Sequence, residues 1–230
     1  MINNYDDFIS ALLKSGFSGA IGGKDDGVFG LFRYGWGAED ETGIQWHTGN
    51  PDLDPWEWRI RVLAERNDIA YSKVFFKKAG YITKEWYPYF LAARRSGRVF
   101  EDDYYDGLIS NHAKRIYEAV IEHEKLPVHR IKQIARFSRE EKSKFDSALT
   151  ELQMRMYLTI CDIYYNVSQT GEQYGFSSTM FCTPELFWGE EVFNEAEDLH
   201  EDEAIEVLSN QILQLNPLAN REKIYKFIKG

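Results

Sequence analysis

The sequence has little cysteine and no long apolar run, and each shortage excludes a class of protein. Its two cysteines, Cys161 and Cys182, are too few for a disulfide framework and form no Cys-x-x-Cys pair. We therefore expect buried thiols in a reducing compartment. No apolar run approaches the roughly 18 residues that a membrane helix needs. The first ten residues lack a basic region followed by an apolar run, so they do not resemble a signal peptide. We expect a cytoplasmic protein with no membrane partner.

Positive charge is also in deficit. The chain has 27 Lys and Arg against 37 Asp and Glu, which gives a net charge of −10. Because overall charge sets the non-specific attraction to phosphate, this balance argues against a general nucleic-acid coat, although a local basic face stays possible. The length of 230 residues with 43% hydrophobic residues predicts a folded protein of one large or two small domains.

The signatures of metal-dependent and nucleotide-dependent enzymes are missing. His123 stands beside Glu124, but the next histidine is six residues later and Pro127 intervenes, so the zinc-protease spacing is absent. The run GLFRYGWG lacks the lysine-serine ending of a phosphate loop. We expect no cofactor and no bound metal, and we assign no catalytic residue.

The first part of the chain, residues 1–105, is expected to form an N-terminal domain. A short helix covers about 5–14, and the glycine- and aromatic-rich segment 16–50 predicts short strands or loops with turns at Asp26-Gly27 and at 48–51. Asp54 followed by proline predicts a helix start. The patterns then predict three basic and aromatic helices, over about 54–67, 69–79 and 83–95.

Residues 106–183 show the order helix, helix, helix, strand, loop, strand. Ser110 caps a helix over about 111–124, Pro127 opens a short helix, and Ser138 with Glu141 forms a capping box for a third. Two strand-like runs follow, separated by the polar loop 166–175. We predict a mainly α protein with a small β part (α+β), containing a winged helix-turn-helix, possibly tandem. Helical additions lie at both ends, and residues 184–230, first acidic and then helical, pack on the rest.

The third helix of this region predicts the fold better than it predicts base recognition. Its apolar stripe is centred on Phe145. The outer face is then formed by Glu140, Ser143, Ser147, Thr150 and Met154, with Lys144 and Glu151 at its edge. Reading helices usually offer Arg, Asn or Gln there. Contact with the DNA backbone, or no DNA contact, fits this face better.

Residues 71–98 carry most of the local positive charge. Seven cations stand there with one acid, Glu85, and aromatic residues between them; the cations are Lys73, Lys77, Lys78, Lys84, Arg94, Arg95 and Arg98. This mixture suits a nucleic-acid groove, but it also suits two amphipathic helices whose rings are core and whose lysines are solvated. The acidic segment 185–203 has nine acids and no Lys or Arg. It either faces solvent or lies against the basic stretch.

Three quoted segments together resemble the AlkZ/YcaQ-type winged-helix proteins, and more closely the shorter AlkZ-related proteins of bacteria. They are DGLISNHAKRIYEAVIEHEKLPVHRIKQ, KFDSALTELQMRMYLTICDI and EAEDLHEDEAIEVLSNQIL. The segments DPWEWRIRVL and IAYSKVFFKKAGYITKEWYPYF also fit the shorter proteins, so the resemblance covers about residues 51–215. It implies a DNA-related function on a helical scaffold with small β wings. The characterised members are DNA glycosylases with a Gln-x-Gln motif, which does not occur here.

Three functions therefore stay open. The favoured one is DNA binding without the glycosylase chemistry, through the 166–175 wing and ten cations: Lys73, Lys77, Lys78, Lys84, Arg94, Arg95, Lys132, Arg136, Arg139 and Lys144. The second is a DNA glycosylase whose acid is Asp52, Asp54 or Glu57, although a helix cap beside core tryptophans is the favoured interpretation there. The third is a protein-binding winged helix, favoured if 185–203 covers 71–98.

Overall fold

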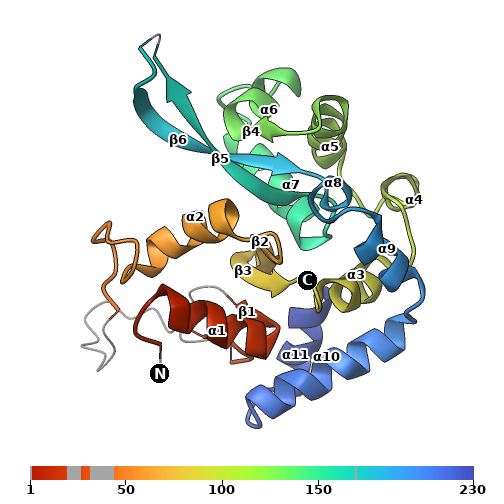
Figure 1. Ribbon diagram of the computed structural model, residues 1–230. Helices are drawn as coiled ribbons and strands as arrows, with labels where there is room; N and C mark the ends of the chain where they lie inside the picture. Colours follow the sequence, from red (N-terminus) through yellow and green to blue (C-terminus); the bar gives the residue numbers. More distant parts are fainter. Residues whose placement is uncertain (1, 20–26, 32–43, 169) are drawn as a thin grey trace.

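The computed structural model describes residues 2–19, 27–31, 44–168 and 170–230 (Figure 1). In these ranges, helices surround one antiparallel sheet with the strand order β1-β3-β2-β5-β6-β4. The α+β class predicted from the sequence is therefore confirmed. The strands are β1 (Phe17–Gly19), β2 (Ile69–Phe75), β3 (Lys78–Thr83), β4 (Leu126–Pro127), β5 (Thr159–Val167) and β6 (Gln173–Cys182).

The helices of the described residues precede, interrupt and follow the sheet. In the N-terminal and central parts they are α1 (Tyr5–Ser15), α2 (Pro55–Glu65), α3 (Tyr87–Arg95), α4 (Phe100–Tyr105), α5 (Asn111–His123), α6 (Val128–Ile134) and α7 (Lys142–Met154). The C-terminal ones are α8 (Pro184–Trp188), α9 (Glu190–Glu197), α10 (Glu201–Leu215) and α11 (Arg221–Lys229). Most of the 16–50 segment, including Asp26 of the expected turn, lies outside the described residues.

Several helix starts follow from capping side chains that the sequence predicts. Asp54, Ser110 and Asn220 each accept a hydrogen bond from a backbone N–H in the first turn of α2, α5 and α11. The capping box at Ser138 is only half formed: the Glu141 carboxylate accepts from the Ser138 N–H at 2.9 Å, and α7 begins at Lys142. That hydrogen bond lowers the pKa of Glu141.

The helix expected over 69–79 is wrong, because this segment forms the hairpin of β2 and β3. Phe76 and Lys77 form its two-residue turn with φ of 50° and 62°, the positive pair that a type I′ turn requires. Thr83 ends β3, and its hydroxyl donates to the Gly16 carbonyl at 2.9 Å. The next helix therefore begins at Tyr87, four residues later than its expected start at Thr83.

Both faces of the β2–β3 hairpin are buried, and each supports its own apolar core. Ile69 and Tyr71 face the core shared with α1, α2, α5, α6 and α7. Ala70 and Val74 face the second core, which α3, α9, α10 and α11 cover. Phe75 stacks on Phe227 of α11 with a centroid distance of 3.9 Å, which joins the hairpin to the C-terminal helices.

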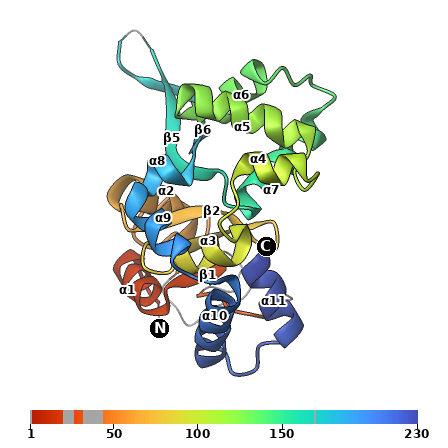
Figure 2. The ribbon, with the colours of Figure 1, turned by 90° about the vertical axis from the view of Figure 1, so that its right-hand side faces the viewer.

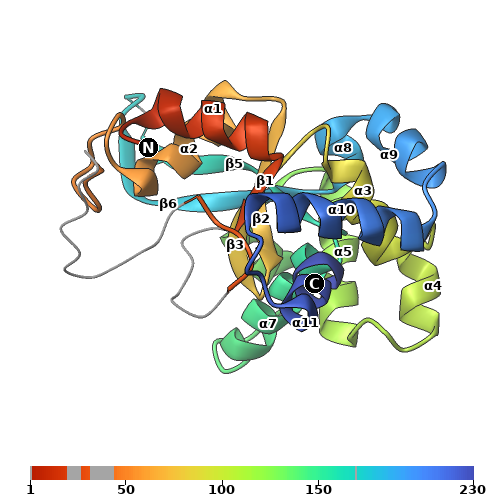
Figure 3. The same cartoon turned by 90° about the horizontal axis from the view of Figure 1, so that it is seen from below.

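One sheet runs through all parts of the molecule. Tyr71 of β2 pairs with Ile160 of β5, so the N-terminal hairpin continues into the long β5–β6 hairpin. In Figure 2 that hairpin projects beyond α5 and α6, whereas α1, α10 and α11 lie at the other end. Figure 3 shows α10 lying beside α3, on which it packs. No helix in the described ranges is both long and apolar enough to cross a membrane.

Candidate nucleic-acid interface

Helix α7 presents the outer face that its sequence predicts. Phe145, Ala148, Leu149, Leu152 and Met156 are all buried. Ser143, Lys144 and Ser147 are exposed on the other side, and Thr150, Glu151 and Met154 are half-buried. The stripe therefore points into the core, and the hydroxyl-rich face stays on the surface.

Two hollows follow this outer face of α7. The larger has a volume of about 680 Å³ and lies at the C-terminal end of the helix; it is lined by Lys77, Arg94, Ser147, Thr150, Glu151, Met154, Arg155, Lys229 and Gly230. The second, of about 380 Å³, lies nearer the N-terminal end; it is lined by Ser110, His112, Ser143, Lys144, Ser147, Ala148 and Glu151. Four cationic side chains and one acidic side chain line the larger hollow, in a chain whose net charge is −10.

Gln153 holds the basic hairpin beside the C-terminal end of α7. Its buried side-chain carbonyl accepts from the Ser72 hydroxyl and from the Lys73 N–H, both at 3.0 Å. The Lys77 N–H in the turn donates to the Met154 sulfur at 3.3 Å. These contacts place the exposed side chains of Lys73, Lys77 and Lys78 at that end of α7.

Arg94, which the sequence predicts as part of a DNA face, has a structural role. Its guanidinium donates to the carbonyls of Met154, Phe227 and Ile228, at 2.8, 3.0 and 2.7 Å. These carbonyls belong to the last turns of α7 and α11, where unpaired carbonyls attract a cation. Burial lowers the pKa of Arg94, and the three acceptors favour its charged form.

The second half of the basic stretch, residues 84–98, is called here the α3 half, and two of its cations lie against acidic residues. Arg95 is buried and forms an ion pair with Glu185 at 2.9 Å. Lys84 pairs with Glu191 at 2.5 Å. Both acids belong to the segment 185–203, so this segment does cover part of the stretch. Arg95 and Lys84 are thus paired with acids of the same protein, and their place on a DNA face stays a prediction.

Arg98, the last cation of the stretch, also pairs with acids of the protein. Its guanidinium donates to Asp103 at 2.5 Å and to Asp106. Asp103 is buried and also accepts from the Tyr157 hydroxyl at 2.9 Å. This network ties α4 to the segment after α7.

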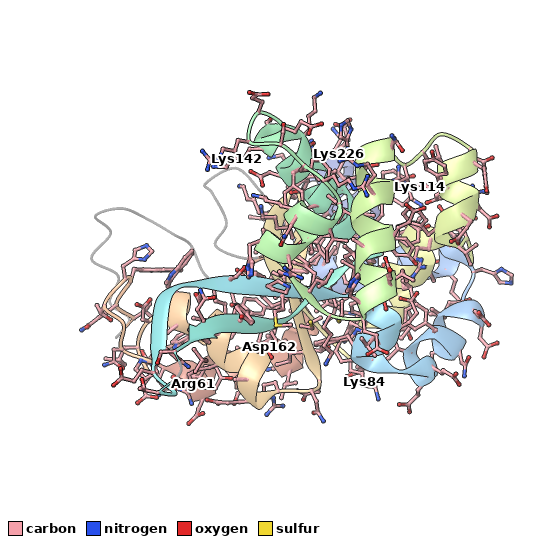
Figure 4. All side chains as sticks on the ribbon, turned by 90° about the horizontal axis from the view of Figure 1, so that it is seen from above. Arg61, Lys84, Lys114, Lys142, Asp162 and Lys226 are labelled. Carbon is pink, nitrogen blue, oxygen red and sulfur yellow. The ribbon has the colours of Figure 1, made fainter. Side chains whose placement is uncertain are left out.

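The second group of predicted cations lies around the N-terminal end of α7. Arg136, Arg139 and Lys144 are exposed. Lys132 is partly engaged, because its ammonium is 3.8 Å from Asp146 and 4.7 Å from the centroid of the Phe145 ring. Lys142, in the first turn of α7, adds an exposed cation. In Figure 4, Lys142 and Lys84 lie at opposite edges of the view.

The tip of the β5–β6 hairpin lies away from the basic hairpin. The loop includes Ser168, whose hydroxyl bonds to Thr170, and an exposed Gly171 with φ of 85°. Figure 1 shows it extending beyond α2, on the side remote from α11. The predicted wing therefore does not join the 71–98 lysines in one cluster.

The candidate glycosylase acids have structural partners. Asp54 is fully buried, and its carboxylate accepts from the N–H groups of Trp56, Thr48 and Gly49 at 2.8–3.0 Å. It is the N-cap of α2 and is not available to polarise a substrate. Asp52 pairs with Arg61 at 2.9 Å. Glu57 is half-buried in the first turn of α2.

The sequence reasoning missed Arg155 and Lys229, which line the larger hollow. Arg155 follows α7 and is 3.3 Å from Asp103, and Lys229 donates to the Ala93 carbonyl and pairs with Glu201 at 2.6 Å. Arg155 stands outside any basic run, so no local signal marked it. Lys229 ends the basic helix α11, and the charge of that helix is the signal that could have found it. Among the described residues, no three of His, Cys, Asp and Glu are grouped so that they could hold a metal ion.

The fold and this surface define an α+β protein with a partly cationic face along one helix. A family model described as AlkZ-related matches residues 2–229. The chain therefore belongs to the AlkZ-related family, as the sequence resemblance indicates.

A search of solved structures finds one similar protein. The structure is the DNA glycosylase AlkZ of Streptomyces sahachiroi, with 16% identity and a TM-score of 0.36. The match covers 74% of this chain and 49% of that one, so the chain spans about half of the glycosylase's length. A likeness at this level carries no argument about mechanism. No curated protein matches this sequence.

Proposed function

We propose that this protein binds DNA through the outer face of α7, as a winged helix-turn-helix module. The order α5, β4, α6, α7, β5, β6 supports this module, together with the pairing of β6 with both β4 and β5. Membership of the AlkZ-related family supports a role in DNA repair. The boundaries 1–105, 106–183 and 184–230 stay a prediction.

The observation that carries the proposal is the placing of cations at both ends of α7. Lys73, Lys77 and Lys78 lie at its C-terminal end, and Arg136, Arg139 and Lys144 at the other. A helix of 13 residues is about 20 Å long at ~1.5 Å per residue. A major groove is about 12 Å wide, so cations at both helix ends suit the phosphates at its two edges.

The chemistry of this face supports contact with the backbone more than with bases. Ser143, Ser147 and Thr150 offer hydroxyl groups, which bind phosphates and bases alike. Glu151 lies among them, where it repels phosphate. We therefore propose binding with little sequence preference and a steep dependence on salt.

The test is reversal of the hairpin lysines. We expect the variant K73E/K77E/K78E to bind duplex DNA roughly 10- to 100-fold more weakly at low salt, because three phosphate contacts are lost. The slope of log affinity against log salt should fall by about 3. Fluorescence anisotropy with duplex, nicked and crosslinked DNA measures both quantities.

A matched variant separates local contacts from net charge. K14E/K125E/R221E makes the same charge change at exposed positions on α1, before β4 and on α11. We expect it to retain most of the affinity. An equal loss in both triple variants, or no binding by the native protein, rejects the proposal.

A second candidate, base removal by a DNA glycosylase, rests on Glu151. This carboxylate lines both hollows beside α7 and accepts from the Ser110 N–H and hydroxyl at 3.0 and 2.8 Å. Glycosidic cleavage uses a carboxylate to position water. Release of base from alkylated or crosslinked oligonucleotides, lost in E151Q, would support this function. Intact oligonucleotide at high protein concentration rejects it.

A further inference from the structure

A separate pocket of about 270 Å³ lies between α4 and α5. Its walls include the aromatic rings of Phe100, Tyr104, Tyr105 and Tyr117, and the carboxylates of Glu101 and Glu118 also line it. It shares no lining residue with the hollows beside α7.

The rings form a partly prearranged wall. Phe100 is buried and stacks on Tyr117 with a centroid distance of 3.8 Å and an interplanar angle of 13°. Tyr105 is 82% exposed and Ile121, at the same pocket, is 52% exposed. Large apolar side chains left in water beside a fixed aromatic wall are typical of a contact surface.

The charge of the pocket selects its ligand. The lining contains two carboxylates and one cation, Lys114, and α4 adds the exposed Asp102 next to Glu101. This excess of acid repels a phosphate group. Aromatic faces and carboxylates together are the combination that binds organic cations.

The protein itself places a cation here. The Lys114 ammonium lies 4.2 Å from the centroid of the Tyr104 ring and 3.7 Å from Glu118 (Lys114 is labelled in Figure 4). Because the lysine side chain is long and flexible, a stronger cationic ligand can displace it. A guanidinium fits better than an ammonium, since it also stacks on rings and pairs with a carboxylate through two N–H groups.

We propose that this pocket binds an arginine side chain of a partner protein. The guanidinium stacks on the exposed ring of Tyr105 and pairs with Glu118, and it displaces the Lys114 ammonium. The site is independent of the DNA face, so a partner can bind while α7 is occupied.

The test is an NMR titration of the full chain with a short peptide, Gly-Gly-Arg-Gly-Gly, blocked at both ends. The control peptide carries citrulline, which has nearly the shape of arginine without the charge. We expect the arginine peptide to shift the amide signals of Tyr105 and Ile121 and to bind at least about 3-fold more tightly than the citrulline peptide. Equal binding of the two peptides overturns the proposal.

Three variants sharpen the test. K114A removes the internal cation and should strengthen arginine binding roughly 3-fold, whereas E118Q and Y105A should weaken it by a similar factor. Y225A, which removes a tyrosine of α11 that is 53% exposed, should leave the affinity unchanged. Unchanged or weaker binding in K114A overturns the displacement of Lys114. None of these variants should alter DNA affinity, so this proposal and the DNA proposal fail separately.

Discussion

The two halves of the basic stretch 71–98 have similar compositions and different positions in the protein. The side chains of Lys73, Lys77 and Lys78 on the β2–β3 hairpin are exposed. Four cations of the second half pair with carbonyls or carboxylates of other segments; they are Lys84, Arg94, Arg95 and Arg98. A cluster of cations in a sequence therefore does not specify a cationic surface, because the partners come from distant segments.

The largest effect is expected for Arg94. R94A removes the cation from the carbonyl ends of α7 and α11 and leaves three partly buried acceptors without their donor. We expect the free energy of unfolding to fall by about 3–5 kcal/mol, measured by urea denaturation. K73A, at an exposed position of the other half, should change it by less than ~0.5 kcal/mol. A small effect of R94A would remove the distinction between the halves.

The single variants K77E and K84E compare the halves directly for DNA binding. Both reverse one lysine of the same stretch. K77E should weaken binding roughly 3- to 10-fold and lower the salt slope by about 1. K84E should have little effect, since Lys84 is already paired with Glu191 and lies across the molecule from Lys142 (Figure 4). Anisotropy at two or more salt concentrations measures both variants, and equal losses would contradict the comparison.

A smaller effect, of opposite sign, is expected at Glu151. This acid lies between the two cationic ends of α7, so its charge opposes phosphate binding. E151Q keeps the side-chain carbonyl that accepts from Ser110, and it should strengthen DNA binding roughly 2- to 5-fold. Q214E, made on α10 at an exposed position, changes the charge elsewhere and should have no comparable effect. Weaker binding in E151Q would show that the carboxylate contributes to binding.

The smallest effect concerns the acidic segment that engages α3. Glu201 accepts from Lys229 and from Ser96, and these bonds lower its pKa from the ordinary value of a glutamate. Because the pKa of Glu201 is lower in the folded than in the unfolded protein, its bonds to Lys229 and Ser96 stabilise the fold at pH values above the unfolded-state pKa. The contribution is lost as the pH falls through the lowered pKa. It should stay below ~1 kcal/mol because Glu201 is largely solvated.

The measurement for Glu201 is the urea midpoint between pH 6 and pH 3. The native protein should lose slightly more stability over this range than E201Q, which has no carboxylate to protonate. A larger loss in E201Q would contradict the assigned sign.

Local sequence patterns were sufficient to predict a helix wherever its apolar periodicity and its capping residue indicated the same bounds. Ser110 and the stripe of Phe145, Ala148 and Leu149 predict α5 and α7, because one face of each helix is buried and the other is solvated. The pattern failed at 69–79. There both faces of the strand are buried, so apolar residues do not alternate. The turn residues Phe76 and Lys77 also lack the Asn-Gly signal of a type I′ hairpin.

Local sequence patterns were enough to predict the α+β class, the family, the central order of helices and strands, and the outward face of α7. They could do so because caps and periodicity act between residues a few positions apart. Long-range contacts, in contrast, set which cations pair with other segments of the protein. Arg94 donates to carbonyls at the ends of α7 and α11, and Arg95 pairs with Glu185. Gln153 holds the hairpin at the end of α7. These partners lie about 60 to 134 positions apart in the chain, and no local pattern encodes contacts of that range.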